Sequence, residues 1–399
     1  MSKKAKPYKT SIEWDICEKD PLVMQYKNVI IKHEKMETTM RGVMTVLSGK
    51  IDPGVVLLVG ATGVGKSTLI DTLKRKLLES TKQVAKGRSA TNPIVWTRAR
   101  PPEKGKFDWR GYLSGALIQA GDVLPHRKVV SPATLPLFDD LPEQIALDGN
   151  SLSALRQALE SCLRHRKTRF LVIDEAQYLL FIRDNHLAHQ LETIKSLAEE
   201  AGVVIILVGT YQLLEVQNQS AQLVRRSQVI TFSRYYDDEE GDVRDFAEAA
   251  FNLYDKIPIN KKLDVETSIR FLYKQSSGCV GILKDWFTAT LSACIRENQE
   301  FNLAQLKATA RANKDLLTIL REAMDGEKRS RDMSDDEYEV AVLKLKAELG
   351  VANPSGRADK RENAAAGAQN KKTNKTMKSN RVGKRLPKRD PVGDIHASA

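Results

Sequence analysis

The stretch that decides the fold is Val55-Val-Leu-Leu-Val-Gly60-Ala-Thr-Gly-Val-Gly65-Lys66-Ser67-Thr68, in which an apolar run leads into a glycine-rich segment. This segment matches the phosphate-binding pattern GxxxxGK followed by Ser or Thr at every position. The apolar run predicts a buried strand, and apolar residues recur at helical spacing after Lys66. A strand, a glycine-rich turn and a helix N-terminus in this order are typical of a site for the phosphates of a nucleoside triphosphate.

Individual residues of this segment receive roles from its chemistry. Backbone N–H groups from Gly63 to Lys66 converge on a diphosphate only where no side chains crowd the approach. Lys66 is expected to reach the β- and γ-phosphates, and the Ser67 hydroxyl is expected to complete the shell of a Mg²⁺ ion. The predicted nucleotide-binding residues of the segment are Gly60, Ala61, Thr62, Gly63, Val64, Gly65, Lys66, Ser67 and Thr68.

Length and composition bound the class of protein. The chain has 399 residues, 41% of them hydrophobic, which is enough for two or more domains with substantial cores. No apolar run approaches the ~20 residues of a membrane span, and the N-terminal MSKKAKPYK contains no apolar stretch. The four cysteines are scattered, so neither a zinc site nor a disulfide framework is predicted. The protein is expected to be soluble and cytoplasmic.

The positive charge is concentrated at the C-terminus. The formal net charge is +12, and residues 351–399 hold 12 Lys and Arg against 4 Asp and Glu. This segment is rich in Ala, Asn, Gly and Lys and has few large apolar residues, so it is predicted to be a disordered basic tail. Such a tail contacts nucleic acid or an acidic partner, or it serves only as a solubilising segment.

Strand and helix patterns alternate through the first part of the chain. Apolar strand signals are present at 55–59, 92–97, 169–174, 203–210 and 229–232. They predict an α/β fold with a parallel sheet flanked by helices and with ligand sites at the carboxyl ends of the strands. After Ser233 the patterns become helical, at about 241–256, 264–276, 279–297 and 302–324, and Ser334-Asp-Asp-Glu337 is a capping box that begins a further helix. The predicted parts are an N-terminal helical extension (1–50), an ATPase core (51–235), a helical lid (236–325), a short helical extension (326–350) and the tail (351–399).

Two carboxylates are expected to complete the nucleotide site. Asp174 and Glu175 end an apolar strand 108 residues after Lys66. Hydrolysis needs one carboxylate to hold Mg²⁺ and another to activate or position water, and Asp174 and Glu175 suit these roles in that order. Thr210 ends the next strand, where its hydroxyl either contacts the γ-phosphate or the attacking water, or caps a turn.

Two groups of cations have open roles. Arg225 and Arg226 either include an arginine that reaches a neighbouring subunit's γ-phosphate or form a pair of exposed cations. The loop from Arg98 to Lys106 either contacts the phosphate backbone of duplex DNA or is a solvated surface loop. Its cations are Arg98, Arg100, Lys104 and Lys106.

Several of these segments occur together in one known family. They are Gly60-Ala-Thr-Gly-Val-Gly-Lys-Ser67, Phe107-Asp-Trp109-Arg110-Gly-Tyr112-Leu113, Val172-Ile-Asp-Glu-Ala-Gln177, Leu207-Val-Gly-Thr210 and Ser276-Ser-Gly278-Cys-Val-Gly281-Ile-Leu-Lys284. In this combination the chain resembles the AAA+ ATPases and, more narrowly, the TnsC/TniB transposition regulators, with MuB and IstB-type proteins as more distant functional relatives. The resemblance covers about residues 20–325.

The resemblance implies an activity and partners. ATP-bound subunits would assemble as a ring or helical filament on duplex DNA, recruit and stimulate a transposase, and disassemble on hydrolysis, with a target-selection protein choosing the site. The ATPase activity would be stimulated by DNA and by oligomerisation. Many lids of this family place a sensor arginine just after the position of Gly278, whereas here Gly281 follows and the nearest cation is Lys284.

Other readings share the same core. An origin-recognition or helicase-loading ATPase would usually add a C-terminal winged helix, whereas residues 326–399 offer one short helix and a basic tail. A DNA-bound scaffold would use ATP only as an assembly switch, which Glu175 argues against. A small-molecule kinase would not need the helical lid and the basic tail.

Overall fold

The computed structural model describes residues 20–48, 54–84, 91–102, 105, 107–122, 152–180, 187–219 and 227–349. The segment predicted to be a basic tail (351–399) lies outside these residues. So do four of the predicted site residues, Lys104, Lys106, Arg225 and Arg226.

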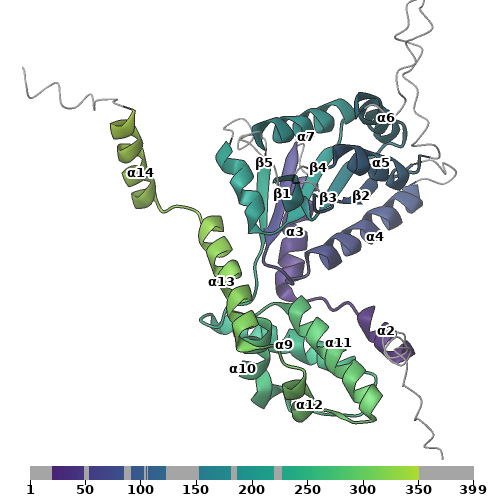
Figure 1. Ribbon diagram of the computed structural model, residues 1–399, viewed down its shortest axis with the longest axis vertical. Coiled ribbons are helices and arrows are strands. Elements are labelled where there is room, and N and C mark those ends of the chain that lie inside the picture. The colour runs from purple at the N-terminus through teal and green to yellow at the C-terminus, as the bar shows by residue number, and fades with distance from the viewer. Residues whose placement is uncertain are drawn as a thin grey trace, which may run out of the picture. The chain divides into compact units, whose positions relative to one another are not determined.

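A five-stranded parallel sheet forms the centre of the nucleotide core (Figure 1). Its strand order is β2-β3-β4-β1-β5, and all neighbours pair in parallel. The predicted α/β class and parallel sheet are therefore confirmed. The strands are β1 (Val55–Gly60), β2 (Ile94–Arg98), β3 (Phe170–Asp174), β4 (Val204–Gly209) and β5 (Ser227–Phe232).

Helices cover both faces of this sheet. Parallel strands need right-handed crossovers, which place α4 on one face and α5, α6 and α7 on the other. Helix α3 packs against α4 and β5, while α5, α6 and α7 form a row in which neighbours touch (Figure 1). The bounds are α3 (Glu34–Ser48), α4 (Lys66–Val84), α5 (Trp109–Gln119), α6 (Leu152–His165) and α7 (Leu187–Ala201), with 3₁₀ turns η2 (Ala176–Leu180) and η3 (Tyr211–Gln219) after β3 and β4.

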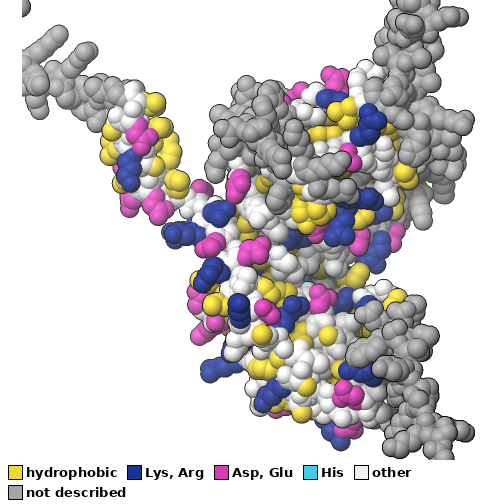
Figure 2. All heavy atoms as spheres, in the orientation of Figure 1, with side chains coloured by type: hydrophobic (Ala, Val, Ile, Leu, Met, Phe, Trp, Pro, Cys, Tyr) yellow, Lys and Arg dark blue, Asp and Glu magenta, His cyan; other side chains and the backbone are white. Residues whose placement is uncertain are grey.

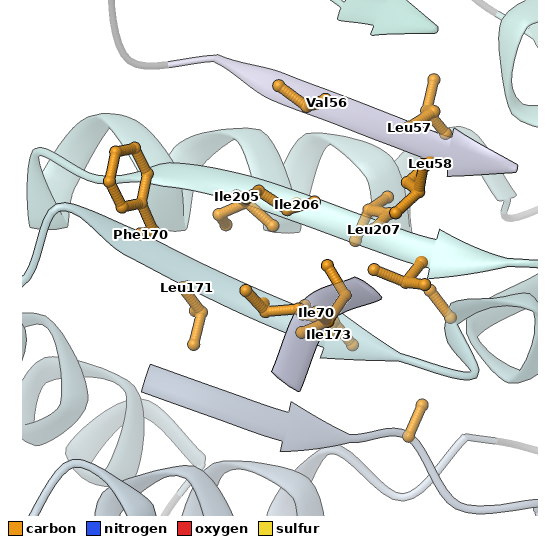
Figure 3. Close-up of a cluster of buried hydrophobic side chains, with 14 of the residues drawn as sticks. Val56, Leu57, Leu58, Ile70, Phe170, Leu171, Ile173, Ile205, Ile206 and Leu207 are labelled. Atoms are coloured by element: carbon orange, nitrogen blue, oxygen red, sulfur yellow. The ribbon is translucent and has the colours of Figure 1, made fainter. Parts of the chain in front are cut away.

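The interior of the sheet is continuous and apolar. Every residue of β1 and β3 is buried, as expected for strands with helices on both faces. Side chains from β1, β3 and β4 gather with Ile70 of α4, as Figure 3 shows. The carboxyl ends of these strands are consequently fixed relative to one another, and Gly60, Asp174 and Thr210, three of the predicted site residues, lie at or directly after these ends.

A helical unit follows the sheet. It consists of α9 (Glu240–Asp255), α10 (Val265–Ser276), α11 (Val280–Glu297) and α12 (Leu303–Ala308), which we call the lid, together with a two-residue parallel pair, β6 (Lys261–Lys262) and β7 (Phe301–Asn302). The prediction of one helix over 302–324 was wrong, because α12 ends at Ala308 and α13 (Asn313–Ser330) begins four residues after Thr309. Thr309 Oγ1 accepts a hydrogen bond from Trp286 Nε1 at 3.2 Å, which fixes the break against α11.

The N-terminal helix α2 (Pro21–Lys27) packs with the lid. Val23 and Tyr26 are buried in the lid core, and the Tyr26 hydroxyl donates to the Leu253 carbonyl at 3.0 Å. Helix α3, in contrast, packs into the sheet core. The segment between these two helices therefore crosses from the lid to the core.

Helix α13 ties the end of β5 to the turn after β4. Arg234, which is 7% exposed, donates from Nε to Glu327 Oε1 at 2.8 Å and from its second terminal nitrogen to Glu327 Oε2 at 3.3 Å. Gly326 lies so close to the Tyr211 ring that a Cβ there would collide with it. Helix α13 therefore holds the segment that follows β5 close to η3.

The chain divides into two units by contacts, residues 1–332 and 333–399, and the second contains helix α14 (Asp335–Glu348). Its predicted capping box is confirmed, since Glu337 N donates to Ser334 Oγ and Ser334 N donates to a Glu337 carboxylate oxygen. The helix exposes several large apolar side chains, namely Tyr338, Val340, Leu343 and Leu345. Figure 2 shows hydrophobic side chains on the surface of α14. Within the described ranges, no helix combines the length and the apolar character that crossing a bilayer requires.

Candidate active site

The glycine-rich segment forms a loop between β1 and α4. Gly63 and Gly65 have φ angles of 79° and 110°, which L side chains rarely adopt, so the loop needs glycine at both positions. Helix α4 begins at Lys66, where the sequence predicted its start. The loop therefore presents backbone N–H groups and a helix N-terminus on one side, the arrangement that binds phosphate.

The Lys66 ammonium lies at the start of this loop. Its Nζ donates to the carbonyls of Gly60 at 2.9 Å and Ala61 at 2.8 Å. Burial lowers the pKa of Lys66 to about 8, and the carboxylates of Glu175 and Asp174 act in the opposite direction. A buried ammonium next to phosphate-binding amides suits a polyanionic ligand, because the negative charge of the ligand would favour the protonated form of Lys66 that burial disfavours.

Ser67 and Asp174 meet although they are far apart in sequence. Ser67 Oγ donates to Asp174 Oδ2 at 3.2 Å, and Glu175 N donates to Asp174 Oδ1 at 2.9 Å. Asp174 is 4% exposed, and burial raises its pKa. A hydroxyl and a carboxylate are the hard oxygen ligands that Mg²⁺ takes alongside phosphates and water. The described part of the chain contains no group of three or more His, Cys, Asp and Glu suited to a metal.

Glu175 lies just beyond β3 in a left-handed backbone conformation, with a φ of 54°. Its side chain is 30% exposed, and both carboxylate oxygens have partners. Arg98 donates to Oε1 at 3.3 Å, and Gln177 Nε2 donates to Oε2 at 2.6 Å. The strand end thus separates two neighbouring carboxylates, so that Asp174 turns inward toward Ser67 and Glu175 lies toward the edge strand.

Thr210, at the end of β4, is connected to Glu175 through Gln177. The Thr210 backbone N–H donates to Gln177 Oε1 at 3.4 Å. Its side-chain Oγ1 is buried and has no hydrogen-bond partner within the described part of the chain. Sequence reasoning gave Gln177 no role, although the polar residue two positions after Glu175 was a signal that could have raised the question.

The first turn of α11 lies directly on the phosphate loop. Gly281 is so close to Gly63 that a Cβ on it would collide with the Gly63 carbonyl oxygen. Lys284, the nearest cation after this turn, donates from Nζ to the Lys27 carbonyl at 2.7 Å and therefore contacts α2. The lid therefore meets the loop through the backbone of Gly281 and the side chain of Ile282.

Arg98 and Arg100 line a groove of about 940 Å³ beside the edge strand β2. Trp96, Phe107 and Tyr112 contribute aromatic surface to the same groove. Of the residues that line the groove, Arg98 also contacts the nucleotide site, because its guanidinium binds Glu175. Its side chain is 62% exposed. One residue therefore faces both the groove and the proposed catalytic carboxylate.

Comparisons with known proteins found a family model and several solved structures that match the chain. Residues 51–217 match the family model described as AAA domain. No curated protein is similar in sequence at a significant level. One matching solved structure is a Walker-type ATPase of Pyrococcus abyssi, with 17% identity, a TM-score of 0.44, and 77% of this chain and 79% of that chain covered. Another is the ORC2 protein of Aeropyrum pernix with ADPNP and ADP, with 15% identity, a TM-score of 0.45, and 87% of this chain and 84% of that chain covered. A third is Drosophila ORC bound to DNA, with 14% identity, a TM-score of 0.42, and 91% of this chain and 87% of that chain covered. Residues 51–217 are therefore similar to the AAA-domain family, and the core has the AAA+ P-loop fold, a parallel five-stranded sheet flanked by helices.

Proposed function

We propose that the protein is an ATP-dependent, DNA-binding regulator of DNA transposition. In this proposal it binds and hydrolyses ATP, assembles as an oligomer on target duplex DNA, recruits and activates a transposase, and disassembles after hydrolysis. The transposition role rests on the resemblance carried by the segments Phe107 to Leu113 and Val172 to Gln177 and by the compact lid. The ATPase step rests on the geometry of the site.

The site supplies the groups that phosphoryl transfer to water requires. The loop amides and Lys66 would hold the phosphates, and Ser67 and Asp174 would hold Mg²⁺, which when bound offsets charge on the phosphate oxygens. Glu175 would orient the attacking water and accept its proton. The buried Thr210 hydroxyl would find a partner in a γ-phosphate oxygen or this water, which removes the cost of about 1–3 kcal/mol for an unpaired buried polar group.

The contact between Arg98 and Glu175 is the observation that carries the link to DNA. An arginine beside a groove is a suitable partner for DNA phosphates, and here it occupies one oxygen of the proposed catalytic carboxylate. A phosphate that drew the guanidinium away would free that oxygen for water. DNA binding and hydrolysis would in this way be coupled through one side chain.

Replacement of Arg98 tests this coupling. In Arg98→Ala, ATP turnover without DNA is expected to rise by up to about fivefold, which corresponds to the ~1 kcal/mol that an exposed ion pair contributes at most. Stimulation of turnover by duplex DNA is expected to fall. Steady-state phosphate release with and without duplex DNA measures both effects. Arg75→Ala, which removes an exposed arginine of α4, is the matched control. Full DNA stimulation in Arg98→Ala would show that DNA acts elsewhere.

Assembly and transposition need separate measurements. Electron microscopy of the protein with duplex DNA and a non-hydrolysable ATP analogue is expected to show rings or filaments on DNA. Stimulation of a transposase by these complexes would distinguish the proposal from an origin-recognition or helicase-loading ATPase. Assemblies that load a helicase and leave transposase activity unchanged would favour the latter.

The pKa of Lys66 predicts how nucleotide affinity depends on pH. Burial lowers this pKa to about 8, so the empty site holds a charged ammonium below pH 8 and loses the charge as pH rises through it. Affinity for the triphosphate is therefore expected to be highest near neutral pH and to weaken above pH 8, as protonation of Lys66 must accompany binding. Calorimetric titrations from pH 6.5 to 9.5 in buffers of different ionisation enthalpy measure both affinity and proton uptake. An affinity for the triphosphate that stays constant over this pH range, with no proton uptake on binding, would contradict the predicted role of Lys66 protonation.

A further inference from the structure

We propose that Gln177 is the positioning residue of this site: it sets the orientation of the Glu175 carboxylate and ties that orientation to the end of β4. The proposal rests on the proposed ATPase function, in which Glu175 activates water. Gln177 would act through Glu175 and would not itself touch the nucleotide. It belongs to η2, the 3₁₀ turn that follows β3.

Both halves of the Gln177 amide are engaged. Its Nε2 donates to Glu175 Oε2 at 2.6 Å, and its Oε1 accepts from the Thr210 N–H at 3.4 Å. Only one orientation of the amide serves both partners, because a carboxylate can only accept and a backbone N–H can only donate. A carboxamide of this length is thus the side chain that bridges the two strand ends with matched chemistry.

Glu175 needs such a support because the backbone does not supply one. Its φ of 54° takes it out of the regular strand, and a non-glycine residue in this region is held there by its surroundings. The carboxylate is 30% exposed, and its other partner, Arg98, is more exposed still. Gln177, in contrast, is 7% exposed and is bonded at both ends, so it is the fixed member of the three.

The bridge also links two groups that hydrolysis would use. Thr210 provides the N–H that holds Gln177, and the same residue carries the buried hydroxyl without a partner. Gly209 leaves room for the amide, since a Cβ there would collide with Gln177 Oε1. A shift of the β4 end would therefore move the amide and, through it, Glu175.

Two variants in the full-length protein test the inference. Gln177→Glu keeps the shape and the acceptor for Thr210 but replaces the donor to Glu175 with a like charge. Gln177→Met keeps the length and removes both hydrogen bonds. Each is expected to lower kcat by about tenfold, a part of the ~10²–10⁴-fold that a positioned general base contributes, while KM for ATP stays within about twofold.

The pH–rate profile separates positioning from a merely structural role. In Gln177→Glu the introduced carboxylate would lie beside that of Glu175, and two neighbouring carboxylates share a proton up to higher pH than a single one. The acid limb of the kcat profile is therefore expected to move to higher pH in Gln177→Glu. It is expected to stay in place in Gln177→Met, which adds no charge. A loss of folded protein would scale kcat equally at all pH values. Gln275→Glu is the matched control, because Gln275 is a 6% exposed glutamine of the lid and a carboxylate there leaves Glu175 untouched.

The outcomes distinguish this inference from the proposed function. If Glu175→Gln is inactive and Gln177→Glu and Gln177→Met both keep the wild-type kcat, the positioning role is overturned and the ATPase assignment stands. If Gln177→Glu has a lowered kcat but the acid limb of its kcat profile does not move, the positioning role is likewise overturned, in favour of a merely structural role. If Glu175→Gln retains full turnover, the catalytic role of Glu175 fails first.

Discussion

Glu175→Gln is expected to lower the rate of ATP hydrolysis by at least about a hundredfold while ATP remains bound. The amide has nearly the shape of the carboxylate but cannot accept a proton from water, and Ser67 and Asp174 are unchanged. DNA-bound assemblies should consequently persist in ATP, because hydrolysis is the step that would end them. Single-turnover hydrolysis and the lifetime of DNA complexes measure the two effects.

The control for this variant is Glu248→Gln, which removes an exposed carboxylate of α9. It should keep wild-type turnover and complex lifetime. Rapid disassembly of the Glu175→Gln protein in ATP, or turnover close to that of the wild type, would count against Glu175 as the catalytic carboxylate. Loss of ATP binding in this variant would instead place Glu175 in nucleotide binding.

Lys66→Ala is expected to weaken ATP binding by about two orders of magnitude. This factor corresponds to about 3 kcal/mol, the upper end of what a hydrogen bond to a charged group contributes. The triphosphate loses its main cationic partner, and ATP-dependent DNA binding should be abolished with it. The variant also leaves the carbonyls of Gly60 and Ala61 without their donor, so its melting temperature must be recorded. Titration calorimetry with ATP measures the affinity.

Lys76→Ala provides the comparison, because Lys76 is an exposed lysine of the same helix, α4. Its ATP affinity should equal that of the wild type. Equal affinity in Lys66→Ala would remove the phosphate-loop assignment itself, and with it the basis for every other assignment at the site.

The sequence predicted the parts of the site that depend on local pattern. The glycine spacing placed the loop between a buried strand and a helix, and the apolar run before Asp174 placed the carboxylates at a strand end, because parallel strands in one sheet share that edge. Elements with a strong chemical signal, such as the capping box at Ser334, were also predicted at the correct residue.

The rest depends on contacts between distant residues, which no local pattern records. Arg98 reaches Glu175 because β2 lies beside β3, and the order of the strands was not available from periodicity. Gln177 acquires its partners only when η2 and β4 come together. The break between α12 and α13 likewise depends on the contact of Thr309 with α11 rather than on a helix-breaking residue.

The placement of α2 in the lid has a mechanical consequence. The chain passes between lid and core at residues 28–33 and 233–239, and His33 Nδ1 and the Tyr235 hydroxyl join these two segments with a 3.0 Å hydrogen bond. It also returns from α12 to the core through α13, which packs on η3 and β1. Because the described part of the chain ties the lid to the core at three places, we expect the lid to move less freely relative to the phosphate loop than a domain on a single linker would. A truncation that begins at Glu34 would remove one of these connections and strip Val23 and Tyr26 from the lid interior. The residues of α2 are accordingly part of a domain whose other helices follow them by more than two hundred positions in the chain.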